Sequence, residues 1–369
     1  RENFAEIEKL AAEMEDEMRS NALAYHFPIV SGNDIQKIWD LRKAGLGILY
    51  NIPGDAKPAP VIEDTTVHPE VLPDYMADFG KIIEKYNLKC VYYAHIATGE
   101  LHLRPILNLK DEKDVKMFHT IALESAKLVK KYRGSLSGEH GDGRLRGEFI
   151  PIMVGDKVYK LFKEVKNAFD PNNIFNPGKI TDTPPMNQSL RYKPGQKLRK
   201  IDTVFDFPEA GSITQAAEKC NGSGDCIKSH TMGGTMCPSF MATRDEKDST
   251  RARANMLREV LTNNTESNPF DSEELYKVLD LCLVCKACKS ECPSSVDVAK
   301  MKMEFLQNYY DTHGIPLRSR AVAYLPRVHK LSAGIPRLTN LFLNNKLTGN
   351  LIKSIIKFAP EREFPPMSK

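Results

Sequence analysis

Seven of the eight cysteines lie in one stretch, from Cys220 to Cys292, and they constrain this chain more than any other feature. The densest part reads Cys282-Leu-Val-Cys285-Lys-Ala-Cys288-Lys-Ser-Glu-Cys292-Pro293, with the spacing C-x2-C-x2-C-x3-C-P. In proteins with two iron–sulfur clusters, three cysteines of such a run hold one cubane cluster and the fourth serves its neighbour. Structural zinc is typically held by cysteine pairs separated by a longer arm, so this crowding favours a cluster. The run predicts a protein that transfers single electrons.

A second, looser group of cysteines precedes this run. Cys237-Pro238 repeats the Cys-Pro ending, and Cys220 and Cys226 are separated by five residues, with Ser223 where a middle cysteine is expected. The last cysteine of each group therefore serves the cluster of the other group. This exchange assigns one [4Fe–4S] cluster to Cys282, Cys285, Cys288 and Cys237. Cys220, Cys226 and Cys292 remain for the other centre. Three thiolates fit either a [3Fe–4S] cluster or a second [4Fe–4S] cluster whose fourth iron takes Ser223, another side chain or solvent.

Not every cysteine needs a metal. Cys220 and Cys226 would alternatively be ordinary buried thiols, since free cysteine is often simply buried. Cys90 lies in an apolar run beside Val91 and Tyr92, and we expect it in the core.

Two groups of polar residues in the first half of the chain indicate a metal and a base. His95 and His102 lie at the two ends of a predicted strand–turn–strand formed by 88–94 and 101–109, where they can converge. Glu139-His140 lies in a glycine-rich turn after a predicted helix. Two histidines and a carboxylate with open positions suit a divalent metal, which can bind an α-hydroxy-carboxylate and lower the pKa of its hydroxyl. The adjacent imidazole is the common general base near neutral pH.

Simpler explanations exist for both groups. An isolated pair of histidines would more often be structural, and only the coincidence with Glu139-His140 favours a metal site. The glycines at 138, 141 and 143 could alternatively form a phosphate loop. No strand-to-helix P-loop with a following Lys-Ser/Thr accompanies them, which argues against that alternative.

Length and composition limit the partners of this chain. Its 369 residues suit two or three domains, and its net charge of +4 is too small to indicate nucleic-acid binding. No apolar stretch is long enough for a membrane span, and we expect no signal peptide. Cysteines spaced for a cluster fit a reducing cytoplasm. Because the first residue is Arg1 and a helical pattern already runs there, we expect an internal piece of a longer polypeptide.

Periodicity and turn residues divide the chain. Helical spacing over 1–25 and mixed strands and helices up to about 180 precede a polar, Pro-containing stretch at 181–208. Beyond it, Ser212-x-x-Gln215 and Asp271-x-x-Glu274 fit capping boxes that begin helices ahead of the two cysteine groups. Residues 315–359 carry eight Lys or Arg and no acidic residue. This tail is either a membrane-surface helix pair or, as we favour, a solvated basic face packed on a further domain.

Several motifs make the first half resemble a known family. They are Trp39-x-Leu41-Arg42, His95-x6-His102, Ser137-Gly-Glu139-His140-Gly-x-Gly143 and Phe175-Asn176-Pro177-Gly178-Lys179. They resemble the C-terminal domain of FAD-linked oxidases of the vanillyl-alcohol-oxidase type, which include D-lactate, glycolate and D-2-hydroxyglutarate dehydrogenases. The resemblance covers about residues 26–180. Residues 212–365 resemble the α-helical ferredoxin part of large bacterial fused flavin and iron–sulfur oxidoreductases, in which a flavin domain precedes this region and cysteine-rich domains follow it.

The resemblance implies roles for individual residues. His95, His102 and Glu139 match the family's ligands for a divalent metal, such as zinc or manganese, and His140 matches its catalytic base. Asn176 matches a residue close to the flavin. Arg42 and Lys57 match contacts to the substrate carboxylate.

The histidine loop departs from the family's pattern His-x-Gly-Asp-Gly-Asn-Leu-His. Ala97, Thr98 and Glu100 replace Gly, Asp and Asn, whereas Gly99 and both histidines remain. The departure leaves the metal and the loop geometry open. Arg104 lies two residues past His102 on the same strand face, and together with Arg42 and Lys57 it would suit a dicarboxylate.

Together these observations predict an α+β ferredoxin-like domain followed by an all-α helical ferredoxin domain. We expect a substrate domain over 1–183, a linker over 184–211, and a two-cluster domain with a basic tail over 212–369. The resemblance implies an enzyme that oxidises a D-2-hydroxy acid, of the 2-hydroxyglutarate or lactate type. Electrons then pass from FAD, bound mostly by a preceding domain, through the clusters to a quinone or a carrier protein.

We expect this piece to be inactive alone, and to lie in the cytoplasm or at most on the periphery of the inner membrane. One alternative is a non-catalytic iron–sulfur electron-transfer module with a degenerate substrate domain. Another is a zinc-binding interaction module.

Overall fold

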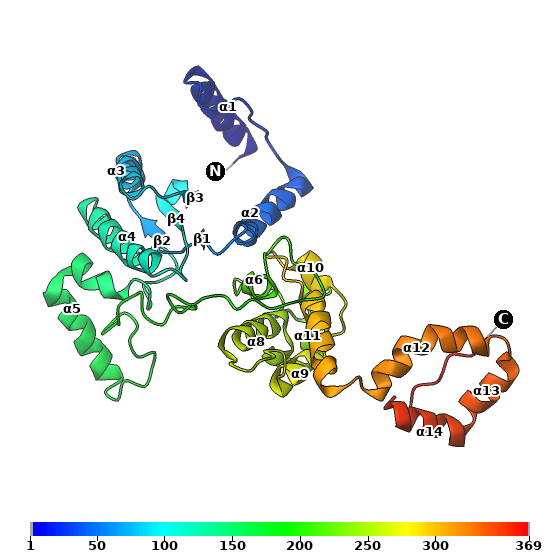
Figure 1. Ribbon diagram of the computed structural model, residues 1–369. Helices are drawn as coiled ribbons and strands as arrows, with labels where there is room; N and C mark the ends of the chain where they lie inside the picture. Colours follow the sequence, from blue (N-terminus) through cyan, green and yellow to red (C-terminus); the bar gives the residue numbers. More distant parts are fainter. Residues whose placement is uncertain (1–2, 368–369) are drawn as a thin grey trace. The chain divides into compact units, whose positions relative to one another are not determined.

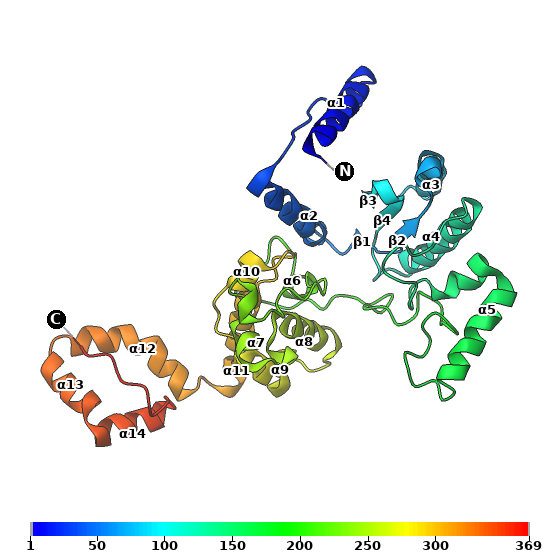
Figure 2. The ribbon, with the colours of Figure 1, turned by 180° about the vertical axis from the view of Figure 1, so that it is seen from behind.

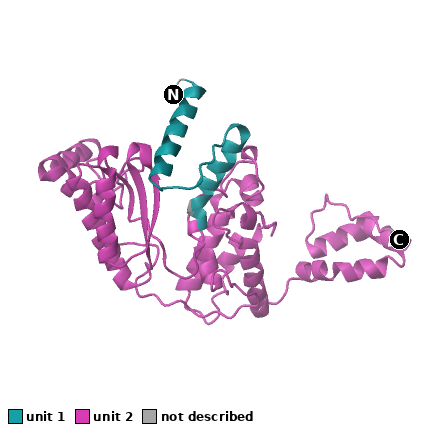
Figure 3. Cartoon of the chain, turned by 90° about the horizontal axis from the view of Figure 1, so that it is seen from above, with its two compact units in different colours: residues 1–48 teal, residues 49–369 magenta. Residues whose placement is uncertain are grey.

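A computed structural model describes residues 3–367, with the side chain of Leu46 left out. It divides into two compact units, residues 1–48 and residues 49–369 (Figure 3). The first unit holds α1 (Phe4–Ser20), η1 (Gly32–Asp34) and most of α2 (Ile35–Leu49). The α1 helix begins where the Asn3 side chain accepts a hydrogen bond from the Glu6 N–H at 2.8 Å. The helix predicted at this end of the chain is confirmed.

The second unit begins with a small antiparallel sheet. Its strands are β1 (Lys57–Pro58), β2 (Ile62–Thr66), β3 (Cys90–His95) and β4 (Glu100–Leu107). The β4 strand is central: β3 pairs with one edge, and β2 and then β1 pair with the other. An isolated antiparallel bridge between Thr66 and Ser135 extends the sheet beyond β2.

The two faces of β4 have different environments. Leu101 and Leu103 point into a core with residues of α3 (Leu72–Lys85) and α4 (Glu112–Lys131), which lie side by side against the strands (Figures 1 and 2). Because side chains alternate along a strand, the polar residues Glu100, His102 and Arg104 share the opposite face. The 3-10 turns η2 (Pro69–Val71), η3 (Ile96–Thr98) and η4 (Gly147–Phe149) and the helix α5 (Ile150–Phe169) complete this part. Its mixture of helices with an antiparallel sheet confirms the coarser fold prediction.

A second core lies further along the chain, and its described residues lie on helices and on the loops between them. It contains α6 (Ile213–Glu218), α7 (Pro238–Thr243), α8 (Thr250–Asn263), α9 (Glu273–Asp280), α10 (Ala287–Glu291) and α11 (Val298–His313), with η5 (His230–Met232) and η6 (Glu246–Asp248). Four of the cysteines are buried within this core, and two others pack against it. Cys90 instead packs against the first core, half-buried on β3.

Of the two predicted helix caps, one is correct and the other is displaced by one residue. Ser212 caps α6 by accepting a hydrogen bond from the Gln215 N–H, as predicted. The α9 helix is capped by Ser272 and not by Asp271, because Ser272 accepts the hydrogen bond from the Leu275 N–H. Asp271 instead contacts His313, with 2.6 Å between Oδ1 and Nε2.

The basic tail forms three helices, α12 (Leu317–Ser332), α13 (Pro336–Asn344) and α14 (Lys346–Ile356). Many of its large apolar side chains, such as Leu331, Leu341 and Leu347, are exposed. Of the helices in the described residues, none combines the length and the apolar character needed to cross a bilayer.

Candidate functional site

The two predicted histidines lie close together on the polar face of the sheet. His95 ends β3 and His102 lies on β4, and their ring centroids are 5.3 Å apart. Gly99 closes the loop between them with a φ of 73°. A Cβ at this position would lie 1.8 Å from the Val67 carbonyl oxygen, so only glycine fits. His102 is buried, and the His95 side chain is partly exposed.

Glu139 and His140 reach the same place from the loop that follows α4. The Glu139 Oε1 atom lies 3.9 Å from His95 Nε2 and 3.8 Å from His102 Nε2. It also lies 3.2 Å from His140 Nε2. His95, His102 and Glu139 each offer a ligand atom, and these three atoms lie within 4.8 Å of one another. Such a group suits one divalent metal ion, with His140 beside it.

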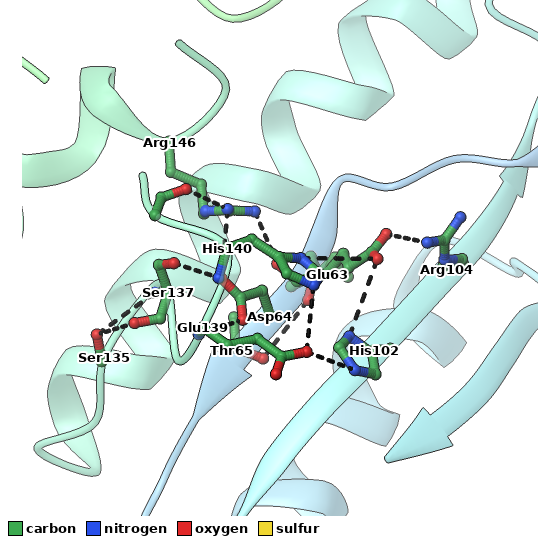
Figure 4. A network of polar contacts seen from close by, with 12 residues as sticks. Glu63, Asp64, Thr65, His102, Arg104, Ser135, Ser137, Glu139, His140 and Arg146 are labelled. Atoms are coloured by element: carbon green, nitrogen blue, oxygen red, sulfur yellow. Dashed lines mark hydrogen bonds and ion pairs between the residues drawn. The ribbon is translucent and has the colours of Figure 1, made fainter. Parts of the chain in front are cut away.

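A β-bulge in β2 positions this loop (Figure 4). The pairing of β2 with β4 shifts register between Glu63 and Thr65, and Asp64, at the shift, has a φ of 79°. A bulge re-aims a side chain, and here it points the Asp64 carboxylate at the loop. That carboxylate accepts hydrogen bonds from the N–H groups of Glu139 at 2.8 Å and His140 at 3.0 Å, and from the Ser137 hydroxyl.

Arg146 fixes the same loop from its other end. Its buried guanidinium donates hydrogen bonds to the carbonyl oxygens of Glu63 at 2.9 Å and Gly141 at 2.6 Å. The segment containing Asn176 is attached nearby, because the Ile180 N–H donates to the Gly143 carbonyl at 3.0 Å.

Glu63 is a second carboxylate at the site, and no sequence motif predicted it. Its Oε1 atom lies 3.9 Å from the Nδ1 atoms of both His102 and His140, and Arg104 forms an ion pair with its Oε2 atom. Glu63, His102 and His140 form a second group that could hold a metal ion. The available sequence signal was an acidic pair, Glu63-Asp64, directly after the apolar run Ala59-Pro-Val-Ile62.

The surroundings of the site raise the pKa of one buried carboxyl group and lower that of another. Burial raises the pKa of Glu100, and a hydrogen bond to Asp64 and the charge of Glu139 add to the effect, giving about 7. Burial alone would raise the pKa of Asp64, but hydrogen bonds from Ser137 and the Glu139 N–H hold it at about 2. Burial lowers the pKa of His102 and so favours the neutral imidazole, which is the form that binds metals.

The remaining predicted residues make contacts of their own. Lys57 pairs with Leu107, five residues along β4 from His102, or about 17 Å at the usual rise of a strand. The Lys57 ammonium donates to the Ile52 carbonyl, away from the histidines. Arg42 lies on α2 over the Trp39 ring, at 5.9 Å from its centroid. Asn176 has a φ of 49° and accepts a hydrogen bond from Lys179 at 3.0 Å.

The cysteines form two groups in the second core. A cavity in this core is lined by the four thiols assigned to one cluster, which are Cys237, Cys282, Cys285 and Cys288. Cys220 and Cys226 are buried in the same core, and Cys292 packs against it. Burial raises the pKa of the Cys226 and Cys292 thiols, and the charge of Cys220 adds to both shifts. Cys220 therefore acts on the pKa of each of the other two thiols.

The thiols of the described residues are too far apart for three of them to bind one zinc ion in this arrangement. A Zn–S bond of about 2.3 Å in a tetrahedral site places sulfur atoms about 3.8 Å apart. Within residues 3–367, only the two histidine–carboxylate groups bring three or more ligand atoms within 4.8 Å, and neither contains a thiol.

Comparison with known families agrees with this division of the chain. Residues 1–180 match the C-terminal domain of FAD linked oxidases, and residues 219–297 match the 4Fe-4S dicluster domain. Each part of the chain is therefore similar to a different family.

Curated relatives match most of the chain. A D-2-hydroxyglutarate dehydrogenase of Pseudomonas putida is 32% identical over 350 residues, which is 86% of this chain and 34% of that protein. The enzyme of the same name from Escherichia coli is 32% identical over 358 residues, with the same shares. A D-lactate dehydrogenase of Archaeoglobus fulgidus is 28% identical over 134 residues, 36% of this chain and 29% of that protein. The chain spans about a third of the length of the first two relatives.

Proposed function

We propose that this chain is the substrate and cluster-binding part of a flavin- and iron–sulfur-dependent dehydrogenase that oxidises a D-2-hydroxy acid. The observation that carries the proposal is the convergence of His95, His102 and Glu139 on one point, with the His140 imidazole directly beside it. The relatives named D-2-hydroxyglutarate dehydrogenase support the substrate class.

The positions of the site residues support a role for each of them. His95, His102 and Glu139 would hold a divalent metal, zinc or manganese, that binds the carboxylate and hydroxyl of the substrate and lowers the hydroxyl pKa. His140 takes the hydroxyl proton on Nδ1 or Nε2 as general base. FAD, when bound, supplies the hydride acceptor, and Asn176 would lie close to it.

Arg104 is the side chain best placed to select the substrate. It lies on the same face of β4 as His102, two residues further along, and it is buried against Glu63. Because a guanidinium binds carboxylates in a bidentate manner, Arg104 would contact a second carboxylate of the substrate, such as that of 2-hydroxyglutarate. Arg42 and Lys57 remain proposed carboxylate contacts.

The cysteines would carry the electrons onward. Cys237, Cys282, Cys285 and Cys288 would hold a [4Fe–4S] cluster. Cys220, Cys226 and Cys292 would hold a [3Fe–4S] cluster or a second [4Fe–4S] cluster. The acceptor would be a quinone or a carrier protein.

The finer fold assignment belongs to the same proposal. With Ser135 added beside β2, the sheet order is Ser135–β2–β4–β3, and the helices α3 and α4 connect its strands. We infer the βαββαβ arrangement of a ferredoxin-like domain, followed by an all-α domain. Domain boundaries near 183 and 211 would fit the two separate cores.

Substitution of His140 tests the proposed chemistry. In the complete, cofactor-loaded polypeptide, His140→Ala should lower turnover of D-2-hydroxyglutarate or D-lactate by on the order of 10²–10⁴-fold, the usual contribution of a general base. Metal and iron–sulfur contents should not change. His119→Gln is a matched control, because His119 lies on α4 and contacts Glu148 of η4. Unchanged turnover in the His140 variant would support the alternative, an electron-transfer module with a degenerate substrate domain.

Metal analysis tests the cluster part separately. The protein should contain iron and acid-labile sulfide, and Cys285→Ser and Cys226→Ser should each remove a different centre. Anaerobic EPR of the oxidised protein distinguishes the second centre, because a three-iron cluster is paramagnetic in that state. Colourless protein with zinc and no sulfide would refute this assignment.

A further inference from the structure

A buried arginine lies in the wall of the four-cysteine cavity. Arg253, on α8, is 1% exposed and has the largest side chain among those that are fully buried. Its Nη1 atom donates to the Cys237 Sγ at 3.5 Å and to the Ser239 hydroxyl at 2.8 Å. The Nε–H donates to the Val278 carbonyl oxygen at 3.0 Å. These contacts hold one end of the guanidinium against a thiol that we assign to the cluster.

A second buried basic side chain contacts the backbone of one of these cysteines. Lys302, on α11, is 8% exposed, and its ammonium donates to the Cys282 carbonyl at 2.8 Å and to the Asp280 carbonyl at 3.0 Å. Two acidic residues lie near these cations. Asp248 is buried and lies 3.6 Å from the Nη2 atom of Arg253, on the guanidinium nitrogen that does not face Cys237. Asp280 is exposed at the end of α9.

Two buried cations beside one cluster have a defined electrostatic consequence. A cluster ligated by thiolates is anionic, and reduction adds one more negative charge without making or breaking a bond. A nearby cation and an N–H donor to sulfur both stabilise the reduced form more than the oxidised form. Arginine keeps its charge even when buried, so its effect persists across the working pH range.

We propose that Arg253 and Lys302 raise the reduction potential of the cluster held by Cys237, Cys282, Cys285 and Cys288. The inference rests on the proposed cluster assignment and adds the residues that tune the cluster's reduction potential.

A raised reduction potential also gives this cluster a place in the electron path. The other group is next to the first core, because Arg191 donates to the Cys220 carbonyl at 2.7 Å and Glu218, two residues earlier, contacts Lys110 at 2.8 Å. Electrons that enter from the oxidase side would then move towards the four-cysteine cluster.

An EPR-monitored redox titration of the cluster-loaded protein tests the proposal. Arg253→Gln should lower the midpoint potential of the four-cysteine cluster, so that its ratio of reduced to oxidised form at the wild-type midpoint falls by about tenfold, or 59 mV for a one-electron couple. Lys302→Gln should shift the same midpoint in the same direction. The other cluster is an internal reference and should keep its midpoint. Arg253→Lys, which keeps the charge, should restore part of the shift.

Lys277→Gln is a matched control, because its exposed side chain pairs with Glu273 on the same helix. Unchanged midpoints in both the Arg253 and the Lys302 variants, with full cluster content, would overturn the inference. If Arg253→Gln prevents cluster assembly, Lys302→Gln decides alone, since it leaves the contacts of Arg253 in place. Wild-type protein without acid-labile sulfide would instead refute the proposed function.

Discussion

At the scale of single residues, several carboxylates act as anchors for backbone N–H groups. Asp170, which follows α5, is one of them. Its Oδ1 atom accepts a hydrogen bond from the Ile174 N–H and its Oδ2 atom one from the Phe175 N–H, each at 2.9 Å, and the Lys166 ammonium is paired with Oδ2. These contacts shape the turn that leads to Asn176.

Asp170 predicts a pH dependence of stability. The hydrogen bond from Lys166 lowers the pKa of Asp170, with the two N–H donors adding to it against the opposing effect of desolvation. Because the folded pKa is below the unfolded value, the contribution is present above about pH 4 and is lost as the pH falls through the folded pKa. Asp170→Asn should therefore lower the urea midpoint at pH 7, and the difference from wild type should shrink towards pH 3.

The control for this prediction is Asp156→Asn, at an exposed position of α5. A difference between Asp170→Asn and wild type that stays constant from pH 7 to pH 3 would contradict it.

At the scale of elements, the loop of Glu139 and His140 depends on the bulge of β2. Asp64 is fully buried, and its carboxylate faces three donors of that loop. A local irregularity in one strand thus positions residues that follow it by about 75 positions in the chain.

Asp64→Asn should weaken both the fold and the metal site. The amide would direct an N–H group at backbone N–H donors, and a buried donor without an acceptor destabilises a protein by about 1–3 kcal/mol. We expect a loss of this size in urea unfolding. Binding of zinc or manganese should weaken by about 10–100-fold, as is usual when support behind the ligands is lost.

Asp74→Asn, at an exposed position of α3, is the matched control. Wild-type metal affinity in the Asp64 variant would show that the bulge does not position Glu139.

At the scale of the whole molecule, a buried polar cluster joins the two cores. The Lys110 ammonium lies 3.0 Å from Asp55 Oδ1 and 2.8 Å from Glu218 Oε2, and its side chain is 9% exposed. Gln215 of α6 also donates to Asp55, at 2.8 Å. This cluster connects the end of β4 to the helix that leads into Cys220.

Lys110→Met should loosen this connection. It leaves the Glu218 carboxylate buried without its cation, and breaking a buried pair in this way typically destabilises by about 3–5 kcal/mol. We expect a lower urea midpoint and faster proteolysis between residues 187 and 211. The exposed Lys113→Met should change neither, and equal behaviour of the two variants would contradict the prediction.

Local patterns were sufficient to predict many elements and several candidate residues that the fold brings together. The strand predicted at 88–94 is observed as β3, Cys90–His95. The strand predicted at 101–109 is observed as β4, Glu100–Leu107. Cluster and metal ligands are recognisable because the coordination geometry fixes which residue types occur and how far apart they lie in the chain. The cap of α9 was misplaced by one residue, since Asp271 and Ser272 are both good caps and a contact with His313 decides between them.

The sequence by itself determined which reactive residues the chain carries and how they are spaced. They are seven closely spaced cysteines, two histidines at the ends of a hairpin, and a Glu-His pair in a glycine-rich loop. Only the tertiary structure placed Glu63 between two imidazoles, Asp64 under the loop and Arg253 against Cys237. These partners are separated by between 16 and 77 positions, and no local periodicity encodes such contacts. They form because a buried charge is stable only beside a partner, and packing decides which partner is available.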